Sequence, residues 1–258
     1  MKILLSPSES KRNPAENVES DERDIGLLDN EMWGGREARN AQILAYIELL
    51  ESADDSELGR VFGTKVLSLE TLKLCSEILS SPRIQAIELY NGVAYKALDF
   101  GSLDSSAQGF LLDSVLIASN LFGLVRASDR LPFYHLNQNY KSKELSLNKL
   151  YKAQKPQIDT LLSGEDVIID LRAQVYAKAY PLARPHYTLE IPSGTSHQAK
   201  HYRGAALRAL AIRYSELLGA GVCGGMAGDL DTSRAGQLEI ELLEYVERHF
   251  ARVECGGK

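Results

Sequence analysis

The sequence is poor in cysteine, and its three cysteines, Cys75, Cys223 and Cys255, lie far apart. No Cys-x-x-Cys pair occurs, and no cysteine lies at a metal-ligand spacing from a histidine. His197 and His201 are four residues apart, but the glutamate of an HExxH metal motif does not stand between them. The sequence therefore predicts no disulfide framework, no metal site and no cofactor.

Long hydrophobic runs are also missing. The apolar run at the start of the chain ends at Ser6 and Pro7, too early for a secretory signal, and no later run approaches the roughly 18 apolar residues of a membrane span. We expect a cytoplasmic protein without a membrane partner. The glycine-rich residues 219–225 are not followed by Gly-Lys-Ser/Thr, which argues against ATP binding through a Walker loop.

An excess of positive charge is missing from the chain as a whole. Its net charge is −6, whereas many nucleic-acid-binding proteins are basic. Residues 126–214 nevertheless hold 14 basic residues against seven acidic ones, so one face or cleft is expected to be basic. The lysines of residues 141–155 are also explained by a solvated helix. With 258 residues, 44% of them hydrophobic, the chain is expected to form a single domain over residues 1–258.

Hydrophobic periodicity predicts the elements of the first third of the chain. Residues 2–5 read as a strand that delivers a polar loop, and residues 12–29 as an exposed excursion. Apolar residues recur at helical spacing over residues 37–50, and again over residues 69–79 after the capping residue Ser68.

Interior strands are expected at residues 84–89, 114–118 and 167–171, with a further strand at residues 186–191. Helices and strands alternate without a regular βαβ spacing or an internal repeat. The predicted fold class is therefore mixed α/β (α+β), a compact domain with a mixed sheet flanked by helices and a basic cleft.

The segment over residues 198–218 reads as a helix, and it contains the first candidate site. Lys200 and Arg203 fall on its inward stripe, where an unpaired charge costs several kcal/mol. They also lie in the first turns of the helix, where an anion is favoured. Either they bind a phosphate or carboxylate, or they pair with an internal acid such as Asp129 or Asp170.

Loops at expected strand ends supply further candidates, because binding residues are commonly placed there. These candidates are Arg126, Asp129 and Tyr134 in one loop, Gly92 and Tyr95 in a second, and Arg172 in a third. An ion pair between Arg126 and Asp129 that braces the turn, and a core position for Tyr95, are the simpler alternatives. In the first loop Glu9 is a candidate acid/base and Lys11 a candidate phosphate clamp.

Five blocks in chain order together resemble the YaaA peroxide stress resistance family. The blocks are residues 3–11 (ILLSPSESK), 90–95 (YNGVAY), 122–134 (FGLVRASDRLPFY), 168–172 (IIDLR) and 200–204 (KHYRG). The resemblance implies a cytoplasmic bacterial protein that limits iron-driven damage under hydrogen peroxide. It also implies a compact α/β domain with a helix-hairpin-helix-like element and a positively charged cleft that binds single-stranded or distorted DNA.

The positions that match the family residue by residue are Lys11, Gly92, Tyr95, Gly123, Arg126, Asp129, Tyr134, Lys200, Arg203 and Gly204. The first loop departs from the Ser-Pro-Ala-Lys form seen in part of the family. The nearest candidate for the hairpin is residues 58–65, whose glycines are four residues apart.

Two functions are expected from these features. The first is DNA binding, with phosphate contacts from Lys11, Arg126, Arg172, Lys200 and Arg203. In that hypothesis Tyr95 and Tyr134, with Gly92, Gly123 and Gly204, line the cleft or stack on a base. The alternative is an enzyme acting on a nucleotide or nucleobase in the same cleft, with Glu9 or Asp129 as acid/base.

Overall fold

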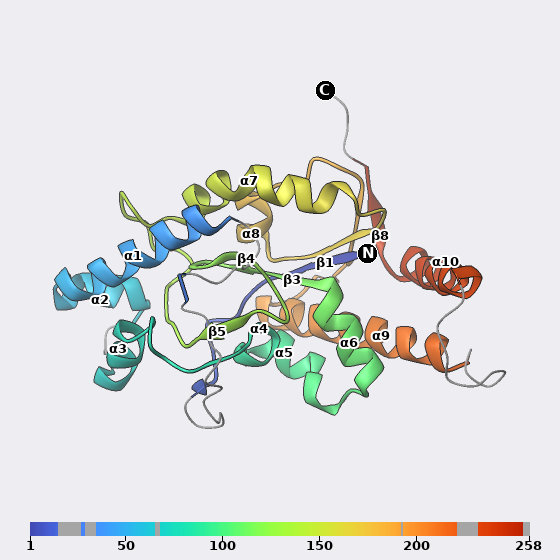
Figure 1. Cartoon of the computed structure of the whole chain (residues 1–258), viewed down its shortest axis with the longest axis horizontal. Helices are drawn as coiled ribbons and strands as arrows, with labels where there is room; N and C mark the ends of the chain where they lie inside the picture. The colour runs from blue at the N-terminus through green and yellow to red at the C-terminus, as the bar shows by residue number, and fades with distance from the viewer. Residues whose placement is uncertain (15–26, 29–34, 65–67, 192, 221–231, 255–258) are drawn as a thin grey trace.

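A computed structural model describes residues 1–14, 27–28, 35–64, 68–191, 193–220 and 232–254, and in these residues a six-stranded mixed sheet forms the centre of the molecule (Figure 1). The strand order is β4-β3-β1-β6-β7-β8. The strands are β1 (Lys2–Leu5), β3 (Val115–Ser119), β4 (Gly123–Arg126), β6 (Ile168–Leu171), β7 (His186–Thr188) and β8 (Ala251–Val253).

The middle of the sheet is parallel and its edges are antiparallel. β1 pairs in parallel with β3 on one side and with β6 on the other, and β6 pairs in parallel with β7. β4 and β8 close the two edges as antiparallel strands. β1, β3 and β6 consist mainly of Ile, Val and Leu, as expected for parallel strands that are covered on both faces.

Helices cover the two faces of the sheet. Side chains alternate along β1, so that Ile3 and Leu5 face one core and Leu4 faces the other. Figure 1 shows α9 and α7 on opposite sides of the sheet. The helices are α1 (Arg36–Ser52), α2 (Asp55–Phe62), α3 (Leu69–Ser76), α4 (Ala86–Leu89), α5 (Val93–Leu98), α6 (Ser105–Ser114), α7 (Leu147–Ser163), α8 (Gln174–Ala179), α9 (Ser196–Ala220) and α10 (Thr232–His249), with a 3-10 turn, η2 (Phe100–Ser102). The predicted mixed α/β domain is confirmed.

The expected early helices are confirmed as α1 and α3. The Ser68 hydroxyl caps α3 by accepting a hydrogen bond from the Thr71 amide at 3.3 Å. The prediction missed α2, which begins after the Asp54 cap and ends at Gly63. None of the described helices is long and apolar enough to cross a membrane.

The expected interior strand at residues 84–89 is wrong. Only Arg83–Gln85 is a strand (β2), and it pairs with β5 (Arg130–Pro132) outside the central sheet. The rest of the run forms α4, whose first two amides donate to the carbonyls of Asp129 and Ala127. A short apolar run is ambiguous between a strand and a buried helical turn, and long-range pairing decides. The strand expected at residues 186–191 is shorter than predicted, because only His186–Thr188 pairs.

The structure describes only part of the predicted excursion over residues 12–29 and of the hairpin candidate over residues 58–65. Of the excursion over residues 12–29, Leu27 is buried in the core, so that point of the segment is not exposed; residues 15–26 and 29 lie outside the described residues. In the hairpin candidate, Gly59 lies inside α2, and Gly63 ends that helix with a left-handed φ of 65°. Lys65 lies outside the described residues.

Candidate functional site at the ends of two parallel strands

The connections that follow β1 and β6 lead to opposite sides of the sheet, so the order of the strands reverses between these two strands. These strands are neighbours in the sheet, but β1 leads to β3 on one side, whereas β6 leads to β7 on the other. The loops that follow them therefore diverge and leave a crevice between them. Ligands of open α/β sheets bind in such crevices at strand carboxyl ends.

A pocket of about 300 Å³ lies at this point. Its volume is at the low end of the range of small-molecule pockets. Four parts of the chain line it: residues 5–10 from β1 and its loop, residues 92–95 at the start of α5, Leu171, Ala173 and Tyr176 from β6 and α8, and Lys200 and Arg203 from α9, with Gln138 at its side.

Hydrogen bonds tie the walls of the pocket together. The Ser6 hydroxyl accepts from the Ala173 amide at 2.6 Å, which joins the β1 loop to the β6 loop. The Tyr95 hydroxyl donates to the Ser6 carbonyl at 2.8 Å, which joins α5 to the same loop. At Gly92 a Cβ atom would lie 2.0 Å from the Ser8 hydroxyl oxygen, so glycine is what lets this wall close on the loop.

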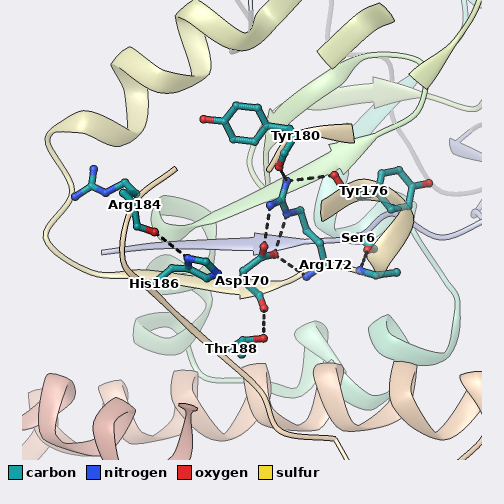
Figure 2. A network of polar contacts seen from close by, with 9 residues as sticks. Ser6, Asp170, Arg172, Tyr176, Tyr180, Arg184, His186 and Thr188 are labelled. Atoms are coloured by element: carbon teal, nitrogen blue, oxygen red, sulfur yellow. Dashed lines mark hydrogen bonds and ion pairs between the residues drawn. The ribbon is translucent and has the colours of Figure 1, made fainter. Parts of the chain in front are cut away.

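A buried ion pair braces the loop after β6 (Figure 2). Arg172 donates from Nε and Nη2 to the two carboxylate oxygens of Asp170, both at 2.8 Å, and from Nη1 to the Tyr180 carbonyl at 3.0 Å. Its side chain is only 1% exposed. Arg172, expected as a phosphate contact, is thus held inside the protein as a structural brace.

Lys200 and Arg203 lie on the first turns of α9 and both line the pocket. Lys200 is exposed and Arg203 is partly buried, and in the described part of the chain neither has a carboxylate within ion-pair distance. Burial lowers the pKa of Arg203, while the nearby charge of Asp170 acts in the opposite direction.

The two acids considered as internal partners are engaged elsewhere. Both carboxylate oxygens of Asp170 accept from Arg172. Asp129 accepts from the Arg126 amide at 2.8 Å and so stabilises the turn after β4. Among the residues that the structure describes, neither acid is therefore an ion-pair partner of Lys200 or Arg203.

Close packing of α5 against α9 places these cations beside the pocket. Gly204 is buried, and a Cβ atom there would lie 1.9 Å from the Ala94 carbonyl oxygen. The glycine therefore serves the contact between the two helices. The helix itself is longer than the predicted residues 198–218, and its buried stripe includes Leu207 and Leu210 as expected.

Of the two candidate residues in the loop after β1, only Glu9 lines the pocket, whereas Lys11 lies elsewhere. Glu9 is exposed and lines the pocket. Lys11 does not line it, because its ammonium group lies over the Tyr134 ring, 4.2 Å from the centroid, and donates to the Glu9 carbonyl at 3.3 Å. Burial lowers the pKa of Lys11 to about 7, against the attraction of Cys75 and Glu9.

The remaining predicted residues lie away from the pocket or within its wall. Tyr134 is fully buried, and its hydroxyl bonds those of Tyr90 and Ser119, so its ring has no face open to a base. Gly123 has a φ of 77° and packs against Gln154. Arg126 and Asp129 do not line the pocket, and Tyr95 lines it but is only 6% exposed.

Sequence reasoning missed several lining residues. Ser6 and Ser8 had a signal, since they directly follow a strand, but Tyr176 and Gln138 had none. Tyr176 reaches the pocket only because α8 folds back beside β6. Cys75 is buried and free, whereas Cys223 and Cys255 lie outside the described residues.

The fold and the pocket define a class of protein: a mixed α/β domain with a small ligand-sized site at parallel strand ends. Residues 1–216 match the family model described as peroxide stress protein YaaA. The chain therefore belongs to the YaaA peroxide stress protein family.

Relatives with similar sequences come from several bacteria. An uncharacterized protein of Campylobacter jejuni is 37% identical over 211 residues, which is 80% of this chain and 83% of the relative. A UPF0246 protein of Streptomyces coelicolor is 30% identical over 181 residues, 70% of this chain and 67% of the relative. A UPF0246 protein of Corynebacterium glutamicum is 30% identical over 227 residues, 84% and 87% of the two chains.

Proposed function

We propose that this chain is a cytoplasmic peroxide stress protein that binds DNA, with Lys200 and Arg203 as its phosphate contacts. The observation that carries the proposal is that both cations line a pocket at strand ends without a carboxylate partner in the described chain. Membership of the peroxide stress family supports the cellular context.

Single-stranded or distorted DNA is the form that suits this site. The pocket of about 300 Å³ admits a ligand the size of one nucleotide, and a paired base in a duplex cannot enter it without leaving the stack. Of the phosphate contacts expected from the sequence, Arg172 is committed to Asp170, and Lys11 and Arg126 lie outside the pocket. The proposal therefore rests on Lys200 and Arg203.

DNA binding also offers a physical route to limiting iron-driven damage. DNA carries a condensed layer of cations, and a protein that neutralises phosphates releases them. Ferrous ions held at those phosphates would be released with the rest. Hydroxyl radicals would then form away from the strand that the protein covers.

Fluorescence anisotropy with single-stranded, duplex and gapped DNA at several salt concentrations tests the proposal. For single strands each phosphate contact contributes about −0.7 to the slope of log K against log salt, so Lys200→Ala/Arg203→Ala should flatten it by about 1.4. Lys143→Ala/Lys152→Ala removes the same charge from exposed positions outside the pocket and should leave the slope unchanged. Equal slopes for the wild type and the pocket variant would contradict the proposal.

An enzyme acting on a nucleotide or nucleobase is the second candidate, favoured by the exposed Glu9 carboxylate in the same pocket as two cations. A carboxylate beside a bound ligand can serve as acid or base. Incubation with nucleosides and nucleotides, followed by mass spectrometry, tests for turnover. Glu9→Gln should abolish any product while ligand binding persists; turnover that survives in this variant would exclude Glu9.

A further inference from the structure

We infer that the pocket between the ends of β1 and β6 takes a nucleotide that carries a terminal phosphomonoester, in preference to an internal phosphodiester. Such a unit is found at a phosphorylated DNA end and in a free nucleoside monophosphate. The inference uses the Lys200–Arg203 site of the proposed function, and it names the ligand chemistry that this site selects.

Charge is the first reason. A phosphomonoester carries about −1.5 to −2 at neutral pH, whereas an internal phosphodiester carries a single negative charge. Two cations, Lys200 and Arg203, line the pocket together with the exposed carboxylate of Glu9, and within the described chain neither cation has a carboxylate at ion-pair distance. A guanidinium that is partly withdrawn from water forms strong two-point contacts with phosphate oxygens, and Arg203 is such a group.

The enclosure of the pocket is the second reason. The β1 loop, the start of α5, the β6 loop and the start of α9 surround a volume of about 300 Å³. An internal phosphodiester needs room for a sugar on each side, so both neighbouring nucleotides would have to leave through the mouth. A terminal phosphate has one substituent and needs one exit.

The lining also suits a nucleoside beyond the phosphate. Leu5, Pro7, Val93 and Leu171 supply apolar surface that a bare phosphate ion would leave unused. Hydroxyl, amide and carboxylate groups supply hydrogen-bond partners for a sugar or a base; they belong to Ser8, Ser10, Gln138 and Glu9. Apolar walls with a few polar groups are typical of small-ligand sites.

The walls are fixed before a ligand arrives. The Ser6 hydroxyl holds the Ala173 amide, Tyr95 holds the Ser6 carbonyl, and Asp170 holds Arg172. A site that is already ordered loses little conformational entropy on binding and discriminates better between similar ligands.

Binding of labelled oligonucleotides that differ only at their ends tests the inference. The probes are one single strand with a hydroxyl at both ends, the same strand phosphorylated at the 5′ or the 3′ end, and, as competitors, thymidine and thymidine monophosphate. We expect at least one phosphorylated strand to bind about tenfold more tightly than the unphosphorylated strand. Arg203→Gln should remove that preference, whereas the exposed Lys152→Gln should keep it.

The outcomes separate this inference from the proposed function. Equal binding of all strands, with no competition by thymidine monophosphate, would refute the terminal-phosphate preference and leave DNA binding intact. Binding of thymidine monophosphate without binding of any strand would support the pocket chemistry and refute the DNA proposal. If neither nucleotide nor DNA binds, both fail. Circular dichroism of the Arg203→Gln protein confirms that a lost preference is not a loss of folding.

Discussion

Replacing Gly204 by alanine should destabilise the protein, although alanine is the better helix former. The new Cβ atom would lie 1.9 Å from the Ala94 carbonyl oxygen and 2.7 Å from its carbonyl carbon. These are backbone atoms, so no side-chain rotation relieves the clash, and α5 and α9 must move apart. Overpacking of this kind costs about 1–3 kcal/mol, and the upper end applies here.

The gain in helix propensity from glycine to alanine offsets about 1 kcal/mol of that cost. The net loss is therefore about 2 kcal/mol, or about 4–8 °C in Tm for a chain of this size. Gly109→Ala is the matched control, because Gly109 lies in α6 with nothing within 4 Å of its Cβ position. That variant should gain up to about 1 kcal/mol.

Differential scanning calorimetry of both variants distinguishes the effects. Opposite signs of the Tm change are expected from the same chemical substitution. Because α5 and α9 both line the pocket, Gly204→Ala should also weaken binding of thymidine monophosphate, whereas Gly109→Ala should not. A Gly204→Ala protein at least as stable as the wild type would show that the two helices are not packed this closely.

Three further substitutions test the buried polar contacts. Arg172→Met should cost about 3–5 kcal/mol in urea unfolding because it leaves Asp170 without its partner, and adding Asp170→Asn should recover part of the loss; a fully additive loss would contradict the pairing. Gln154→Leu should cost about 1–3 kcal/mol because the Leu124 amide and the Phe122 carbonyl lose their partner; an unchanged unfolding midpoint would contradict those bonds. The pKa of Lys11 falls from 10.5 to about 7 on folding, so between these values the unfolded chain binds more protons. Wild-type stability should then rise relative to Lys11→Met by up to about 1.4 kcal/mol per pH unit from pH 7 to 9, and a constant difference would place the ammonium in solvent.

Local patterns predicted three of the described helices and the three apolar inner strands of this fold. α1, α3 and α9 have apolar residues at helical spacing, and β1, β3 and β6 are short apolar runs between polar flanks. The error at residues 84–89 arose because such a run does not say whether its backbone pairs with another strand. The order of the strands has no local signal at all, since it depends on contacts between distant residues.

The site was predictable only in part for the same reason. Helical periodicity predicted Lys200 and Arg203 on the inward stripe of α9. Both line the pocket, but Arg203 is partly buried whereas Lys200 is exposed. The burial of Tyr134 does not follow from any local pattern, because its partners Tyr90 and Ser119 are distant in the sequence. Arg172 has a local partner in Asp170, but its burial also depends on the return of the chain at Tyr180. The sequence can place a residue at the end of a strand, but the residues packed around its side chain determine whether that side chain can reach a ligand.

Ion pairs reduce the positive charge that residues 126–214 present to solvent. Arg172 pairs with Asp170 inside the region, whereas Arg208 and Arg213 pair with Asp99 and Glu216 outside it, so acids elsewhere in the chain offset two of its seven excess positive charges. A paired cation contributes little field at a distance, and a net charge of −6 opposes the long-range approach of a polyanion. Affinity for an anion must then come from direct contact at the pocket. Replacing Lys200 and Arg203 by alanine should therefore weaken binding and flatten its salt dependence, although the chain would keep 27 of its 29 basic residues.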